Sequence, residues 1–198
     1  MKTQPVNLLR VATPFLLLIV LFKGVSCNNA PASNPEKATM ATSRNIKPPQ
    51  IDIHTAVLTG NLAALQQHIQ AGTDVNEKDP FGGSSPLITA TIFDKPAEAK
   101  LLLEAGADVN FKNKEGSTAL HTAAFFCRPQ MVKMLLDKGA DKTIKNGYGV
   151  TAYESVNSPF TEAKPAYDML GKALGPMGLK LDYAYLEKTR PQIAALLK

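Results

Sequence analysis

The sequence predicts an all-α solenoid, in which pairs of helices stack one after another along a single axis. Its first sign is a pattern with a Gly-x-Asp core that recurs every 33 to 34 residues, in segments 71–76, 105–110 and 138–143. Its second sign is a Ser or Thr about a dozen residues after each pattern, where a helix can begin. A repeat of this length predicts small helix pairs that bury their apolar faces only against their neighbours.

Each unit is expected to hold two helices joined by a short turn. Ser85, Thr118 and Thr151 can cap the first helices with a side-chain oxygen, and a proline in the first turn of a helix misses no hydrogen bond. A glycine after each second helix supplies the left-handed residue that ends it. We therefore expect helices over residues 51–59, 62–70, 86–93, 96–105, 119–126 and 129–138.

The C-terminal units depart from this pattern. Ser158-Pro159 should end the first helix of the fourth unit early, and a longer helix is expected over residues 163–174. A fifth unit should start near Leu181, with its second helix over residues 190–198. The sequence therefore predicts about five units, of which the C-terminal ones are irregular.

The phrases Thr118-Ala119-Leu120-His121 and Ala105-Gly106-Ala107-Asp108-Val109-Asn110 resemble the signature of the ankyrin repeat. This resemblance implies an ankyrin-repeat solenoid over residues 50–198, with short β-hairpin loops. It also implies that His54 and His121 bond the backbone of neighbouring loops. Ankyrin arrays are binding scaffolds, so the resemblance implies a protein partner and leaves its identity open.

Residues 1–26 are expected to form an export signal. Lys2 and Arg10 precede an apolar stretch of 12 residues, 11–22, which is too short to span a bilayer. The following Gly24-Val25-Ser26-Cys27 resembles a bacterial lipobox, although the usual leucine three residues before the cysteine is Gly24 here. The resemblance implies a lipid on Cys27, and the alternative is ordinary cleavage after Ser26.

A lipidated Cys27 would place the protein in the bacterial periplasm, anchored to the outer membrane, because the next residue is Asn28 and not Asp. Without the lipid, the protein would be soluble in the periplasm or secreted. Residues 27–49 are rich in Asn, Ala, Pro, Ser and Thr, which predicts a flexible tether.

The charge balance disfavours nucleic acid as a partner. The net charge of +5 includes Lys2, Arg10 and Lys23 of the signal and falls to +2 without them. Such a balance is not typical of nucleic-acid-binding domains. We expect contact with the membrane only through the lipid anchor.

No residue pattern indicates an enzyme. The chain holds three histidines without metal-ligand spacing, no Gly-rich phosphate loop and no G-x-S-x-G turn. His121 lies six residues before Cys127, and on a continuous helix side chains six residues apart point to different faces. Asp74, Asp108 and Asp141 belong to the repeat pattern. We expect no catalytic residue, cofactor or metal.

The candidate partner-binding anchors lie at the ends of the first helices, which the resemblance places on the concave face. They are mostly apolar or aromatic, which favours a binding patch: Leu58, Ile92, Phe93, Phe125 and Phe126. These residues come from three helix-end pairs, Leu58 and Thr59, Ile92 and Phe93, and Phe125 and Phe126. The alternative is that one residue of each pair packs inward or under a hairpin.

A second set of candidates lies in the loops. Lys78, Lys112 and Lys145 occupy the same position in consecutive loops, and Phe81 and Tyr148 lie near the loop tips. This set suggests a basic rim for an acidic partner, with faster association as its main effect. The alternative is that these lysines only keep the edge soluble. Gly82-Gly83 lengthens the first loop.

Four functions remain open at this stage. The first is an exported protein-binding module, whose oligomeric state is open with a monomer favoured. The others are an immunity or inhibitor protein against a toxin of the cell envelope, an accessory to an envelope enzyme such as one in oxidative-stress defence, and a structural spacer.

Overall fold

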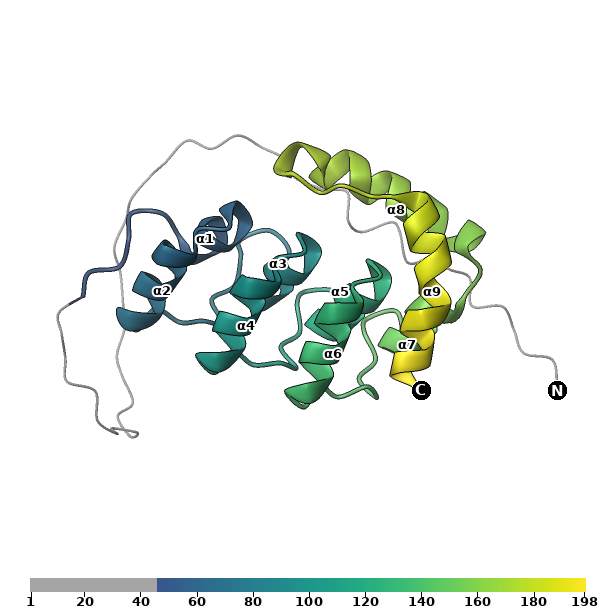
Figure 1. Cartoon of the computed structure of the whole chain (residues 1–198), viewed down its shortest axis with the longest axis horizontal. Helices are drawn as coiled ribbons and strands as arrows, with labels where there is room; N and C mark the ends of the chain where they lie inside the picture. Colours follow the sequence, from purple (N-terminus) through teal and green to yellow (C-terminus); the bar gives the residue numbers. More distant parts are fainter. Residues whose placement is uncertain (1–45) are drawn as a thin grey trace.

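The computed structural model describes residues 46–198, which form stacked helices with no strand in this range. The first three units pair α1 (Ile53–Thr59) with α2 (Leu62–Gln70), α3 (Pro86–Ile92) with α4 (Pro96–Glu104), and α5 (Ala119–Phe125) with α6 (Pro129–Asp137). Figure 1 shows these pairs following one another along the molecule. The predicted solenoid is confirmed. The export signal, Cys27 and most of the tether lie outside the described residues.

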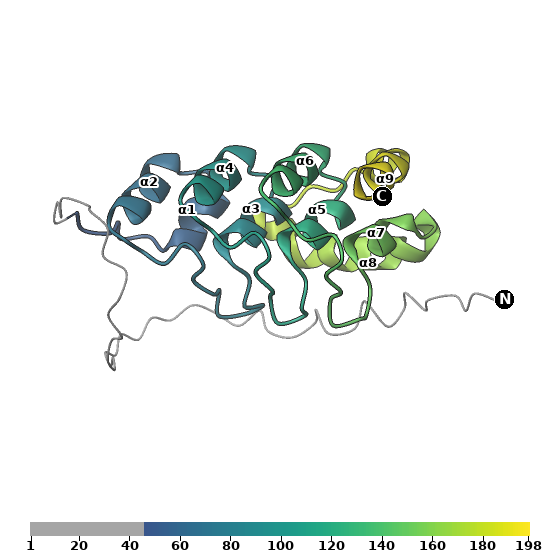
Figure 2. The same cartoon turned by 90° about the horizontal axis from the view of Figure 1, so that it is seen from below.

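The helices form two rows. Figure 2 shows α1, α3 and α5 in one row, α2, α4 and α6 in the other, and three loops that project from the first row. The fourth unit continues both rows with α7 (Ala152–Asn157) and α9 (Tyr183–Leu197). Between these two helices the chain forms α8 (Phe160–Leu174) and a short 3₁₀ helix, η2 (Gly175–Met177).

Local capping explains where the helices begin. The side chain of Ser85 accepts a hydrogen bond from the Ile88 amide at the start of α3. Thr151 and Glu154 form a reciprocal capping box at the start of α7. Pro96 and Pro129 occupy the first turns of α4 and α6. These features are the ones that predicted the helix starts.

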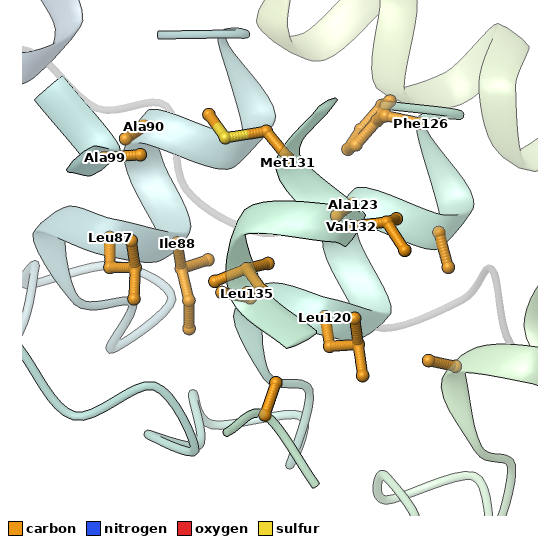
Figure 3. Close-up of a cluster of buried hydrophobic side chains, with 14 of the residues drawn as sticks. Leu87, Ile88, Ala90, Ala99, Leu120, Ala123, Phe126, Met131, Val132 and Leu135 are labelled. Atoms are coloured by element: carbon orange, nitrogen blue, oxygen red, sulfur yellow. The ribbon is translucent and has the colours of Figure 1, made fainter. Parts of the chain in front are cut away.

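Apolar side chains between consecutive units form one continuous core. Figure 3 shows buried side chains of α3, α5 and α6 gathered in one cluster, including Leu87, Leu120 and Leu135. These leucines are at most 1% exposed, and each such burial contributes about 1.5–3 kcal/mol. His68 of α2 is also buried. Its ring bonds Thr73 Oγ1 and the Ile51 carbonyl.

The count of units differs from the sequence expectation. The region predicted as a fifth unit forms the single helix α9, which packs on α7 and α6 as the second helix of the fourth unit. Pro191 lies inside α9 and does not begin a new helix. The described chain therefore holds four helix pairs, and α8 is an insertion within the fourth.

The loops contain turns where β-hairpins were expected. Each loop tip is closed by a backbone hydrogen bond, from Asp79 N to Ser84 O, Asn113 N to Ser117 O, and Asn146 N to Val150 O. The second and third tips each have one more turn bond, from Gly116 N to Asn113 O and from Gly149 N to Asn146 O. Other loop amides donate to Asp and Asn side chains, so no strand ladder forms. Within residues 46–198, no helix has both the length and the apolar character to cross a membrane.

Candidate protein-binding surface

The helix-end candidates are only partly accessible. Leu58, Ile92, Phe93 and Phe125 are half-buried, and Ile92, Phe93 and Phe125 pack against the core. Phe126 is 4% exposed, so its expected role as an exposed anchor is wrong. The alternative, that one residue of each pair packs inward, holds for the pair at the end of α5.

The insertion α8 explains why the end of α5 is covered. The ring of Tyr167 stacks on Phe125 with 4.4 Å between ring centroids, and Phe125 meets Phe126 edge to face at 5.3 Å. The Tyr167 hydroxyl donates a 2.5 Å hydrogen bond to the Phe125 carbonyl. Figure 1 shows α8 running beyond the end of α5. α8 thus covers the ring of Phe125 at the end of α5.

Arg190 of α9 stabilises the packing of α8 against α5 through hydrogen bonds. Its guanidinium donates to the Tyr167 hydroxyl at 3.1 Å and to the Ser158 carbonyl at 2.8 Å. The residue is 3% exposed, so its charge is neutralised by buried dipoles and not by water. Tyr167 and Arg190 therefore link α5, α7, α8 and α9.

Burial shifts the pKa values of the titratable groups near this link. Burial raises the pKa of the Cys127 thiol to about 11, against a smaller opposing effect of Arg190 and Arg128. Burial also raises the pKa of Tyr167 and lowers that of His121. A thiol with so high a pKa stays protonated near neutral pH and is a poor nucleophile.

The histidines at the repeat positions are structural. His54 bonds Thr89 Oγ1 at 3.1 Å and the Glu77 carbonyl at 2.9 Å. His121 bonds Thr118 and, at 3.1 Å, the Val150 carbonyl. The expected bonds to neighbouring loops are confirmed. No cluster of ligands in residues 46–198 could hold a metal ion.

The loop candidates are more accessible. Lys78, Lys112 and Lys145 are exposed, and Phe81 is 62% exposed. Tyr148 is half-buried, with its hydroxyl enclosed and without a hydrogen-bond partner, so it is not a free tip residue. Burial and the nearby carboxylate of Glu115 raise its pKa.

Sequence reasoning missed two residues of this surface. The Phe111 ring lies 5.6 Å from Lys78 Nζ, in cation–π geometry. Lys114 is exposed and joins the first two loops, since its Nζ donates to the Phe81 carbonyl at 2.6 Å. The sequence shows that Lys114 comes two residues after Lys112. It does not show that the first two loops lie close enough for Lys114 to bond the Phe81 carbonyl.

Neighbouring loops are tied together at several points. The Asn76 side chain accepts from the Asp108 amide at 2.8 Å, and the Asn110 side chain accepts from the Asp141 amide at 2.9 Å. The Gly147 amide donates to the Glu115 carbonyl at 2.7 Å. These bonds fix neighbouring loops relative to one another, so the three loops form a continuous face.

The outer row of helices carries a different surface. A groove of about 440 Å³ lies between α4 and α6, and its lining includes Lys100, Lys133, Met134 and Lys138. This groove lies on helices of the row opposite to that from which the loops project (Figure 2).

Comparison with known proteins supports the fold. The family model for ankyrin repeats (3 copies) matches residues 53–146. Among solved structures, the chain is similar to the ankyrin repeat domain of Bcl-3, a unique member of the IkappaB protein family. The two are 31% identical with a TM-score of 0.52, over 59% of this chain and 50% of that one. This chain thus corresponds to half the length of its relative.

A search of curated proteins found no match. The repeat pattern, the two rows of helices and the family match nevertheless agree with one another. The chain folds as an ankyrin-repeat solenoid and carries three ankyrin repeats across residues 53–146.

Proposed function

We propose that this protein is an exported ankyrin-repeat module that binds a protein partner through its concave side, chiefly through the loop tips. Ankyrin repeats are protein-binding modules. The observation that carries the choice of surface is the row of exposed lysines at the loop tips, Lys78, Lys112, Lys114 and Lys145, beside the exposed ring of Phe81.

The helix ends form the inner part of this surface. Leu58, Ile92 and Phe93 are half-buried and offer apolar area at the ends of α1 and α3. Phe125 lies against Tyr167 of α8 and Phe126 is buried, so both contribute little in this arrangement. The partner is therefore expected to contact the first two units and all three loops.

The export part of the proposal rests on the sequence. The basic and apolar segments before Cys27 support removal of residues 1–26, acylation of Cys27 and retention at the outer membrane of a bacterium. Metabolic labelling with a radioactive fatty acid should mark the protein and should fail for Cys27→Ser. Equal labelling of that variant would contradict the anchor.

Two charge-matched variants test the binding surface. The mature protein, with Lys78, Lys112 and Lys145 all changed to Ser, should lose its partner in affinity capture from the native cell envelope, because loop charge guides association. In the control variant, Lys100, Lys133 and Lys138 of the outer helices are changed to Ser, which removes the same charge. The control should capture as much partner as the unchanged protein. Equal loss in both variants would contradict the assignment of the surface.

A further inference from the structure

Phe81 is the most exposed large apolar side chain in residues 46–198. It is 62% exposed, compared with 50% for Met177, 42% for Tyr185 and 39% for Leu62. It lies at the tip of the first loop, which spans residues 71–85 and is one residue longer than the loops at 105–118 and 138–151. An exposed ring at the tip of the longest loop is placed to reach a partner.

The backbone that carries Phe81 is fixed from within its own loop. The Asp79 carboxylate accepts hydrogen bonds from the amides of Phe81 and Gly82, both at 2.8 Å, and from that of Ser84 at 2.5 Å. A single side chain thus binds three backbone amides of the tip. The charge of this carboxylate is also satisfied by these bonds.

The second loop fixes the same tip from the other side. Lys114 Nζ donates to the Phe81 carbonyl at 2.6 Å, and the Lys114 amide donates to the Gly82 carbonyl at 3.0 Å. Gly83 has φ +64°, and a Cβ there would lie 3.1 Å from Lys114 Cγ. The tip is therefore ordered before binding, which lowers the entropy cost of using Phe81 as an anchor.

The charges around Phe81 define its partner. Lys78, Lys112, Lys114 and Lys145 are exposed, and none of them forms an ion pair within the described residues. The neighbouring Asp79 carboxylate is occupied by backbone amides, and one carboxylate oxygen of Glu115 is enclosed. Glu77, next to Lys78, is also exposed, so the exposed charges at the loop tips are these four lysines and one carboxylate.

We propose that Phe81 is a preorganised anchor that enters an apolar pocket of the protein partner, and that carboxylates border this pocket and meet the loop lysines. This inference rests on the proposed function and deepens it. The ring supplies the apolar contact area, the Asp79 and Lys114 bonds fix its position, and the four lysines select an acidic rim.

Photo-crosslinking in cells that naturally produce the protein tests this assignment. The full chain is made with p-benzoylphenylalanine at position 81, 145 or 185, one at a time. Positions 81 and 145 should crosslink to the same protein, and position 185 on α9 should not. The crosslinked peptide from position 81 should map to an apolar pocket with Asp or Glu at its edge.

The outcomes separate the two proposals. Crosslinks from position 145 alone, or a pocket edged by lysines or arginines, would overturn the anchor and leave the loop surface standing. Crosslinks from position 185 alone, or from none of the three, would overturn both the anchor and the loop surface. A crosslink from position 81 to nucleic acid would also overturn the anchor.

Affinity for the crosslinked protein provides the second readout. Phe81→Ala should weaken binding about tenfold or more, whereas Tyr185→Ala should leave it unchanged. Lys114→Met keeps the ring but removes the donor to the Phe81 carbonyl, and should weaken binding severalfold. Because Phe81 is exposed, thermal unfolding of Phe81→Ala should match that of the unchanged protein. Unchanged affinity of Phe81→Ala would overturn the anchor.

Discussion

Arg190 is a buried positive charge that the fold neutralises with hydroxyl and carbonyl groups. Its acceptors include the carbonyls of Ser155 and Ser158 at the end of α7, where the helix dipole is negative, and the Tyr167 hydroxyl. Removal of the guanidinium would leave these carbonyls without a donor inside the protein. The residue is therefore expected to hold the fourth unit together.

Arg190→Met should lower the free energy of unfolding by about 3 kcal/mol, because buried acceptors lose their partner. Tyr167→Phe should cost about 1–2 kcal/mol, because only the hydroxyl is removed. Urea unfolding measures both. Since the two residues share a hydrogen bond, the double variant should lose less than the sum of the single losses. Strictly additive losses would contradict the shared link.

Cys127 couples stability to pH. Burial raises the pKa of the folded thiol from 9.0 to about 11, so the folded state keeps its proton where the unfolded state loses it. This contribution is complete below pH 9 and is lost as the pH rises towards 11. Urea unfolding of Cys127→Ala should show a smaller loss of stability between pH 8.5 and pH 10.5 than the unchanged protein. An identical loss in both proteins would contradict the shifted pKa.

At the scale of the elements, neighbouring loops approach each other closely. Gly116 has φ +70°, and a Cβ there would lie 2.9 Å from the Gly147 amide nitrogen of the next loop. Gly139 has φ +83°, but a Cβ there would meet no atom within 4 Å. An alanine at Gly139 would therefore meet backbone strain alone, whereas an alanine at Gly116 would meet both backbone strain and a clash with the next loop.

Gly139→Ala should lower the free energy of unfolding by about 1 kcal/mol, which is the cost of a left-handed backbone alone. Gly116→Ala should cost about 1–2 kcal/mol more, because the loop must also shift. Thermal or urea unfolding of both variants checks this order. The reverse order, or equal losses, would contradict the close packing of the loops.

Local signals predicted most of the helices, and non-local contacts account for the differences. Caps and first-turn prolines lie within a few residues of each helix start, so the sequence shows α2 and the starts of α3 to α6 at their observed positions. The cover over Phe125 comes from Tyr167 of α8, which lies 42 positions later in the chain. No local pattern shows that α8 is an insertion or that α9 returns to pair with α7.

The sequence predicts the parts of the candidate surface that follow the repeat, and it does not show the contacts between loops. Lys78, Lys112 and Lys145 follow the repeat, so their shared position could be inferred from the sequence, and all three are exposed. The Asp79 and Lys114 bonds around Phe81 cross between chain segments and required the structure. The enclosed hydroxyl of Tyr148 likewise depends on its packing in the fold.

At the scale of the whole molecule, the exposed charges at the loop tips are mainly lysines, whereas Asp74, Asp108 and Asp141 are exposed at the bases of the loops and the outer helices carry mixed charge. The lining of the outer groove includes Glu104 and Asp137 as well as its lysines. Of these lysines, Lys100 pairs with Glu104 at 3.9 Å. A partner with an acidic surface should therefore approach the loop face first, and this preference should weaken as salt screens the charges.

The association rate with the captured partner tests the central claim most directly. We compare the unchanged protein, the loop variant with Lys78, Lys112 and Lys145 changed to Ser, and the outer-helix variant with Lys100, Lys133 and Lys138 changed to Ser. At low salt the loop variant should associate about tenfold more slowly, and the outer-helix variant should match the unchanged protein. At about 0.5 M salt the three rates should converge. Equal slowing of both variants, or no slowing of the loop variant, would contradict binding through the loop face.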